Sequence, residues 1–154
     1  HAWRRILEIL LQPPEVQMTE KLSDTLANHV RAFNDCECAR LLGMEIADVW
    51  DGGARVVMDT EGKRNVHRVA HGGAVFAVAD QAFGIAANAQ GGMQVAVSAH
   101  IHFIAPATGV LEAIAERRAE SRDHSVYEVR VYADGRLVAQ FEGVAWKKSG
   151  NSRI

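Results

Sequence analysis

The chain has 154 residues, which is the size of a single domain able to bury a substantial core. Its formal net charge is −2 and its acids and bases are interspersed, so it lacks the basic face that non-specific nucleic-acid binding requires. Cys36 and Cys38 are the only cysteines, too close together for an ordinary disulfide, and no signal peptide or membrane-length apolar run is evident. We therefore expect a cytoplasmic protein.

The N-terminal segment is expected to form two helices. Apolar residues recur at helical spacing over residues 2–11 and again over residues 19–33, and Pro13 and Pro14 separate the two stretches. Their polar faces mix acids and bases, which favours packing on the core or on a partner subunit over anchorage to a membrane. The pattern divides the chain into a helical extension at 1–34, a main domain at 35–148 and a tail at 149–154.

The main domain alternates between extended segments and one helix. Segments 44–50 and 54–60 form a hairpin around the turn at 51–53. Four longer extended segments, at 94–104, 110–122, 124–133 and 136–146, follow a helix at 71–88. Asp134 and Gly135 form the strongest hairpin signal in the chain. The order predicts an α+β fold in which an antiparallel sheet curls around one central helix.

The central helix carries the chemistry. It is apolar on all sides from residue 74 to 87, so other structure must wrap it. Gly72 and Gly73 open it, where the first-turn amides lack intrahelical partners and a ligand can come close, which favours an anion or a developing oxyanion. Asp80 is the one carboxylate in mid-helix. Burial would raise its pKa, and both a catalytic role and a structural role, capping a loop or pairing with an Arg, are open.

A set of spaced residues resembles a known family. Asn65 precedes His71, Gly72 and Gly73, Asp80 is the ninth residue after His71, and a Phe-Ile-Ala-Pro strand end follows at 103–106. In this order the residues resemble the phenylacetic acid degradation (PaaI-type) acyl-CoA thioesterases, which have the hot-dog fold. The similarity runs from about residue 34 to 148, so the N-terminal helices lie outside it and 35–148 is the expected thioesterase domain.

The resemblance implies hydrolysis of an acyl-CoA thioester to free acid and CoA. Asp80 matches the nucleophile or general base, the Gly72 amide the oxyanion donor, and Gly73 the residue that allows close approach. Asn65 matches the residue that positions the thioester or the water, and His71 the one that supports this loop. No metal or cofactor is implied beyond the CoA of the substrate. Aryl-acetyl and medium-chain acyl groups are favoured, and carrier-protein thioesters stay open.

The spacing of Gly72 and Asp80 constrains the assembly. Eight helical residues span about 12 Å, too far for both groups to touch one carbonyl. We therefore expect a homo-oligomer in which Gly72 of one chain faces Asp80 of another across an antiparallel helix pair. A dimer is the minimal enzyme, and the family often pairs dimers into tetramers.

Two further sets of residues are candidates for substrate binding. Five cations near strand ends are candidates for the CoA phosphates: Arg117, Arg118, Arg122, Lys147 and Lys148. The family often has a Thr or Ser early in the strand after the helix, where this chain has Ala96. Ser98, expected on the same strand face, is a candidate to supply that hydroxyl.

Three other interpretations compete. His67 with His71, and His100 with His102, have spacings that zinc sites use, although no carboxylate or Cys pair completes a set, and His100 and His102 also suit a substrate groove or a subunit interface. A non-catalytic acyl-CoA-binding or regulatory hot-dog protein is the main alternative to the enzyme. A hydratase or dehydratase is disfavoured, because Asp80 occupies the thioesterase position.

Overall fold

The computed structural model describes residues 2–11, 31–33, 35–89 and 91–149. Its helices and strands are, in chain order, α1 (Ala2–Leu11), α3 (Glu37–Leu42), β1 (Met44–Trp50), β2 (Gly53–Asp59), α4 (Gly72–Asn88), β3 (Gln94–Phe103), β4 (Val110–Glu120), β5 (His124–Ala133) and β6 (Arg136–Lys147). The expected second helix, at 19–33, lies mainly outside the described residues. Its last three residues, 31–33, are described and are helical. The division at 34/35 and 148/149 stays a prediction.

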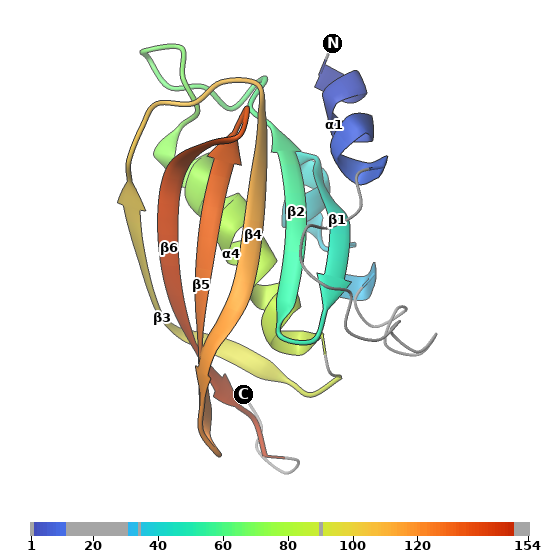
Figure 1. Cartoon of the computed structure of the whole chain (residues 1–154), viewed down its shortest axis with the longest axis vertical. Helices are drawn as coiled ribbons and strands as arrows, with labels where there is room; N and C mark the ends of the chain where they lie inside the picture. The colour runs from blue at the N-terminus through green and yellow to red at the C-terminus, as the bar shows by residue number, and fades with distance from the viewer. Residues whose placement is uncertain (1, 12–30, 34, 90, 150–154) are drawn as a thin grey trace.

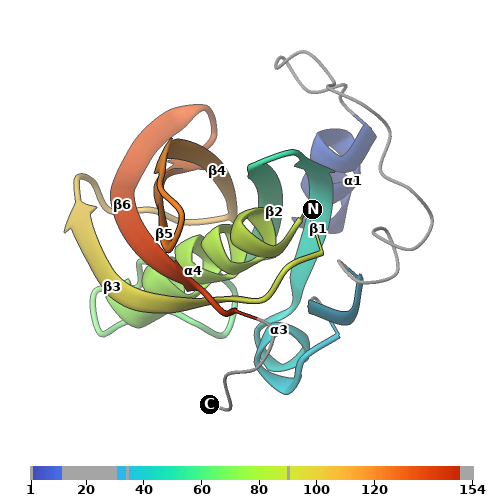
Figure 2. The ribbon, with the colours of Figure 1, turned by 90° about the horizontal axis from the view of Figure 1, so that it is seen from below.

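The six strands form one antiparallel sheet in the order β1-β2-β4-β5-β6-β3. Figure 1 shows the sheet in front of α4, and Figure 2 shows it curling over one side of that helix, with β3 and β1 at its two edges. The predicted fold class is confirmed. None of the described helices is long and apolar enough to cross a membrane.

Local packing and capping explain the two helices outside the core, α1 and α3. On α1, Ile6 is 4% exposed and packs with Val57 and Val110 on the outer face of the sheet. The short helix α3 was not expected from the sequence. The Sγ atom of Cys36 caps its first turn by accepting a hydrogen bond from the Ala39 amide, and Gly43 ends it with a left-handed φ of 63°.

Aromatic packing fixes α4 against the sheet. Phe83 is 1% exposed, and its ring centroid lies 5.5 Å from that of Tyr127 and 5.7 Å from that of Phe141. Both distances are within the range of favourable aromatic pairs. The ring fits because β6 carries a glycine, Gly143, beneath it: a Cβ at this position would lie 2.8 Å from the ring. The Phe83 ring thus interlocks α4 with β5 and β6.

Polar side chains hold the C-terminal end of α4 to the strands. Asn88 donates to the Gly84 carbonyl and accepts from the Gln94 amide, at 2.9 and 2.8 Å. Gln94 donates in turn to the Ala87 carbonyl at 2.6 Å and accepts from the hydroxyl of Ser125. These bonds satisfy the helix end and join it to β3 and β5.

The β3 edge of the sheet and the nearby face of α4 are uncovered. Strand β3 pairs only with β6, and most of its residues are exposed, including Val97 at 56% and Phe103 at 58%. The face of α4 turned away from the sheet is small or polar, and its residues, at 73, 77, 80, 81 and 84, are all exposed or half-buried. An unpaired strand edge beside an unpartnered helix face is the kind of surface that oligomers use.

The contact at Gly143 gives a test of the core. Gly143→Ala is expected to destabilise the fold by about 1–3 kcal/mol, because the Phe83 ring has no room to retreat. Gly92→Ala is the matched control, since a Cβ there meets nothing within 4 Å, and it should change stability by no more than about 0.5 kcal/mol. Urea unfolding measures both. Equal midpoints for the two variants would contradict the packing described here.

Candidate active site

The start of α4 leaves one amide without a partner. His71 is the N-cap, with extended φ and ψ of −62° and 137°, and its Nδ1 accepts from the Gly73 amide at 2.9 Å. The amides of Ala74 and Val75 donate to the His71 carbonyl at 2.9 and 3.1 Å. Among the described residues nothing accepts from the Gly72 amide. Because first-turn amides carry partial positive charge, Gly72 presents a free donor at a favourable place for an oxyanion.

Asn65 organises the loop that leads into α4. Its Oδ1 accepts from the amides of His67 and Val69 at 2.9 and 3.4 Å, and its backbone carbonyl accepts from the Arg68 amide at 3.0 Å. These bonds hold Arg68 at a φ of 65°, a conformation rare for a residue with a side chain. With Oδ1 engaged, the Nδ2 group of Asn65 is left to donate elsewhere.

A pocket of about 310 Å³ joins Asn65 to Gly72. Its other lining residues come from the end of the loop, from α4, from the chain after β3 and from β6: Val69, Ala70, Val75, Phe103, Ile104, Ala105, Pro106, Ala107 and Val138. The wall is thus largely apolar, and Asn65 and Gly72 contribute two candidate donors to it. That composition is typical of a site that binds an apolar group and orients one polar atom.

Asp80 lies outside this pocket. It sits two turns along α4 from Gly72, on the face turned away from the sheet, so the expected buried carboxylate is exposed in the single chain. Among the described residues it has neither a hydrogen bond nor an ion pair, so the structural role of capping or pairing finds no partner there. The apolar atoms around it still exclude part of the water, and this desolvation raises the pKa of its carboxyl.

Ser98 and Ala96 do not share a strand face, contrary to expectation. A bulge lies between them, so Ala96 pairs with Ala145 while Ser98 pairs with Val144. Successive β6 residues point to opposite faces, and Ala145 belongs to the buried face. Ser98 is therefore on the outer face, and the hydroxyl that Ala96 lacks is not supplied from this position. Whether Ser98 contacts substrate stays a prediction.

Among the described histidines, His100 and His102 form a close pair. His100 and His102 lie on the outer face of β3 with their Nε2 atoms 3.0 Å apart. His67 and His71 belong to the loop and to the helix cap, and they make no contact with each other. Within the described ranges, no group of three or more His, Cys, Asp or Glu side chains is arranged to hold a metal ion.

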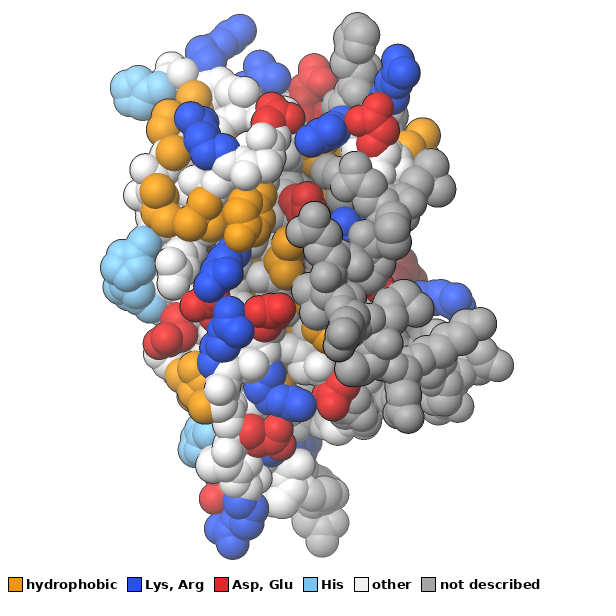
Figure 3. Space-filling model, viewed as in Figure 1, with side chains coloured by type: hydrophobic (Ala, Val, Ile, Leu, Met, Phe, Trp, Pro, Cys, Tyr) orange, Lys and Arg blue, Asp and Glu red, His pale blue; other side chains and the backbone are white. Residues whose placement is uncertain are grey.

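The cations suggested for CoA lie at the far end of the sheet, and all but Lys148 already have acidic partners among the described residues. Arg117 pairs with Asp51 and Glu120, both at 3.2 Å, and Lys147 also contacts Glu120. Arg118 pairs with Glu116 and Glu128 at 3.0 and 2.8 Å. In Figure 3 the cations over the lower part of the visible face are interleaved with acids in this way. Their role with substrate stays a prediction.

Comparison with known proteins agrees with this architecture. The model of the thioesterase superfamily matches residues 67–140. The acyl-coenzyme A thioesterase PaaI of Escherichia coli (strain K12) is 34% identical over 126 residues, which cover 79% of this chain and 89% of that protein. A putative esterase of Deinococcus radiodurans is also 34% identical, over 119 residues, which cover 74% of this chain and 81% of that protein.

Structural comparison gives the same result. The structure of the E. coli PaaI protein superposes with a TM-score of 0.78 at 32% identity, covering 84% of this chain and 98% of that one. The similarity thus extends over most of this chain and nearly all of the other. The chain therefore belongs to the thioesterase superfamily and, within it, to the PaaI-type thioester hydrolases with the hot-dog fold.

Proposed function

We propose that this protein hydrolyses acyl-CoA thioesters at a site shared between two subunits. One chain supplies the Gly72 amide and Asn65, and the other supplies Asp80. The observation that carries the proposal is the unpartnered Gly72 amide, which opens into an apolar pocket at the positive end of a helix. The thioester carbonyl would accept from this amide, and the Nδ2 group of Asn65 is the second candidate donor in the same pocket.

The proposed steps use only backbone and side-chain groups. In the general-base route, Asp80 takes a proton from water as the water oxygen bonds to the carbonyl carbon, and negative charge collects on the oxygen held by Gly72. Collapse of this intermediate breaks the carbon–sulfur bond, and the CoA thiolate leaves and takes up a proton. In the nucleophilic route, the Asp80 carboxylate attacks the carbonyl carbon, the carbon–sulfur bond breaks and the CoA thiolate leaves and takes up a proton. Water then hydrolyses the resulting mixed anhydride to the free acid and restores Asp80.

The shared site follows from the geometry of α4. The helix is continuous from Gly72 to Asn88, so about 12 Å separates Gly72 from Asp80 within one chain. Asp80 lies on the exposed helix face beside Ala77 and Gly84. Alanine has a small side chain and glycine has none, so a second helix can approach this face closely. An antiparallel helix pair would bring Asp80 of one chain to Gly72 of the other, with the open β3 edge available to join the two sheets.

The acyl group is assigned from the pocket wall. Val69, Val75, Phe103 and Val138 offer apolar surface to an aryl-acetyl or medium-chain acyl group, and one of the similar proteins is named an acyl-CoA thioesterase of the PaaI type. Release of CoA thiol from a panel of aryl and aliphatic acyl-CoA substrates tests this assignment. The alternative function, a non-catalytic acyl-CoA-binding protein, is supported by one observation, which is that Ala96 lacks the strand hydroxyl. It predicts that the protein binds CoA but releases no thiol.

Asp80→Asn is expected to lower kcat by about 10²–10⁴-fold, because the amide can neither accept the proton nor attack. In the parent protein, kcat/KM should fall as the pH drops through the pKa of Asp80, and desolvation places this acid limb above the ordinary value of 3.8. Thiol release measured against pH checks both. Full activity in the variant would refute the role of Asp80.

The stability of the same variant is the control. The pKa of Asp80 is higher in the folded than in the unfolded chain, so ionisation disfavours the folded state at neutral pH and this effect disappears below the ordinary pKa. Asp80→Asn should therefore be as stable as the parent protein or more stable at pH 7. A large loss of stability would show that lost turnover reflects unfolding.

Gly72→Pro removes the free amide while keeping the helix. Proline is favoured at the first helical position, and the extended conformation of His71 suits a residue before proline. Gly72→Ala is the matched control, because it keeps the amide and places the same Cβ 3.3 Å from the Phe103 ring. We expect kcat of Gly72→Pro to be about 10²–10³-fold below that of Gly72→Ala. Equal rates would contradict the oxyanion site.

Mixing the two inactive chains tests whether the site is shared. In a heterodimer of Asp80→Asn and Gly72→Pro, one site combines an intact Gly72 with an intact Asp80 from the other chain. Random pairing during co-expression should therefore restore about one quarter of the parent activity. Thiol release by the purified mixture measures it. If both groups acted from one chain, the mixture would be as inactive as each variant alone.

A further inference from the structure

Three arginines near the pocket have no acidic partner among the described residues, unlike the arginines at the far end of the sheet. Arg64 and Arg68 flank Asn65 in the loop, and Arg136 begins β6. Within the described part of the chain none of the three forms an ion pair, whereas Arg117 and Arg118 each pair with two acids. We call Arg64, Arg68 and Arg136 the rim arginines. Their charge is therefore available to a ligand.

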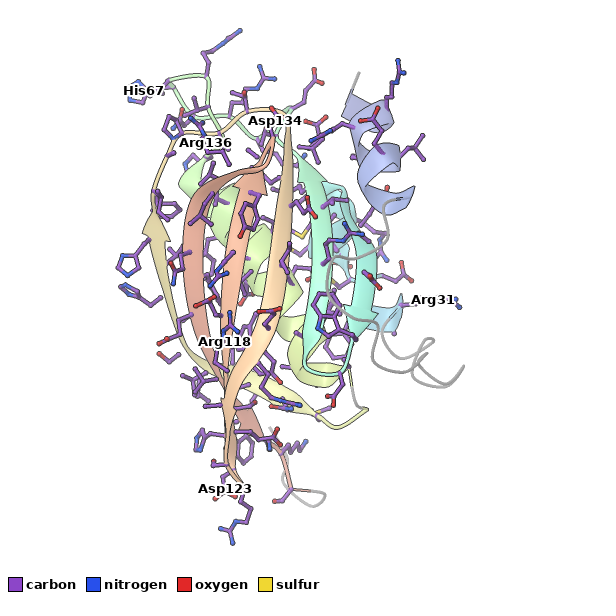
Figure 4. The ribbon with its side chains drawn as sticks, in the orientation of Figure 1. Arg31, His67, Arg118, Asp123, Asp134 and Arg136 are labelled. Carbon is purple, nitrogen blue, oxygen red and sulfur yellow. The ribbon has the colours of Figure 1, made fainter. Side chains whose placement is uncertain are left out.

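Arg136 is placed beside the pocket by the backbone. Its Nη2 donates to the carbonyl of Pro106 at 3.0 Å, and Pro106 lines the pocket that contains Gly72. A second hollow, of about 450 Å³, is lined by Arg136 and shares three residues with that pocket: Val69, Pro106 and Ala107. Figure 4 shows Arg136 at the same end of the molecule as His67, with Arg118 and Asp123 toward the other end.

Arg64 and Arg68 complete the rim from the loop. Arg64 lines a neighbouring hollow that meets the one beside Arg136 at Asp134, and the backbone of Arg64 is fixed by its bridge to Ala70. Arg68 is fixed by the hydrogen bond of its amide to Asn65. Acids also line these hollows, but Asp134 lies 3.9 Å from Arg5 and an Asp59 oxygen accepts from the amide of Glu61. Glu61 also lines the hollow beside Arg64. The loop at 61–70 carries this one acid against three bases, Lys63, Arg64 and Arg68, so its formal charge is +2.

We propose that the rim arginines bind the phosphate groups of coenzyme A. This inference rests on the proposed function, in which the thioester lies against Gly72 and the pantetheine arm leaves the pocket toward its rim. The pyrophosphate and the 3′-phosphate of CoA carry several negative charges, and a guanidinium binds phosphate through two parallel hydrogen bonds. Arg136 and Arg68 are held by backbone contacts, so less side-chain and loop freedom is lost on binding.

The test compares substrates with and without phosphate. The triple variant Arg64→Ala/Arg68→Ala/Arg136→Ala should weaken CoA binding and raise KM for acyl-CoA at least about tenfold, with kcat unchanged. Its kinetics with the matching acyl-pantetheine, which lacks phosphate, should equal those of the parent protein. Calorimetry gives the dissociation constant of CoA, and thiol release gives kcat and KM.

A second triple variant, Arg31→Ala/Arg40→Ala/Arg130→Ala, controls for the lost net charge. It removes three exposed cations away from the rim and should leave CoA affinity within about twofold of the parent value. Equal weakening by both triple variants would overturn the assignment. So would an equal rise in KM for acyl-CoA and acyl-pantetheine, because the rim would then act by shaping the pocket.

The binding measurement separates this inference from the proposed function. Calorimetry with CoA requires no turnover, so rim-dependent CoA binding without hydrolysis of any substrate would refute the thioesterase and support the phosphate site. Conversely, Asp80-dependent hydrolysis with rim-independent CoA affinity would support the thioesterase and refute the phosphate site. In that case the cations at the far end of the sheet, tested by Arg118→Ala/Arg122→Ala/Lys148→Ala, become the competing location.

Discussion

The rigidity of α4 is the constraint on which the site depends. One unbroken helix carries both the free amide of Gly72 and the carboxylate of Asp80, and the Phe83 contact fixes it to the sheet. Because a helix does not shorten, the two groups stay about 12 Å apart in any single chain. The sheet covers only one side of the helix, and the proposed shared site would place a second copy on the other side (Figure 2). The same rigidity that separates the groups in one chain would hold them in register across two.

The loop before α4 leaves Gly72 as the free amide donor at the start of the helix by engaging the neighbouring amides. A helix N-terminus has several unpaired amides, and any free neighbour of Gly72 would compete for the same oxygen. The His71 carbonyl accepts from the amides of Ala74 and Val75, and its ring nitrogen accepts from the amide of Gly73. Asn65 similarly uses one end of its amide for the loop and keeps the other end free. Positioning is thus done by the same side chains that the resemblance places in the site.

Much of this could be predicted from the sequence, because it depends on local patterns. The all-round apolar helix, the Asp134 and Gly135 turn and the alternating strands determine the fold class. The misses have long-range causes. The bulge that turns Ser98 outward depends on pairing with β6, which no pattern within β3 reveals. The exposure of Asp80 depends on which side of α4 the sheet leaves uncovered. Arg117 and Arg118 each pair with an acid of β4 and also with an acid outside it, Asp51 and Glu128 respectively, and spacing along β4 could not reveal these second partners.

The partial exposure of Asp80 and its raised pKa are both consistent with a carboxylate that a second helix would cover. In the single chain the carboxylate keeps contact with water, so its desolvation is partial. A second helix laid against this face would remove more of that water and push the pKa of Asp80 further up, toward the operating pH at which a general base works best. The same desolvation would strengthen the attraction between the Gly72 amide and a developing oxyanion. Assembly would therefore bring the two groups together and also make each of them more effective, which gives the shared site a physical reason beyond proximity.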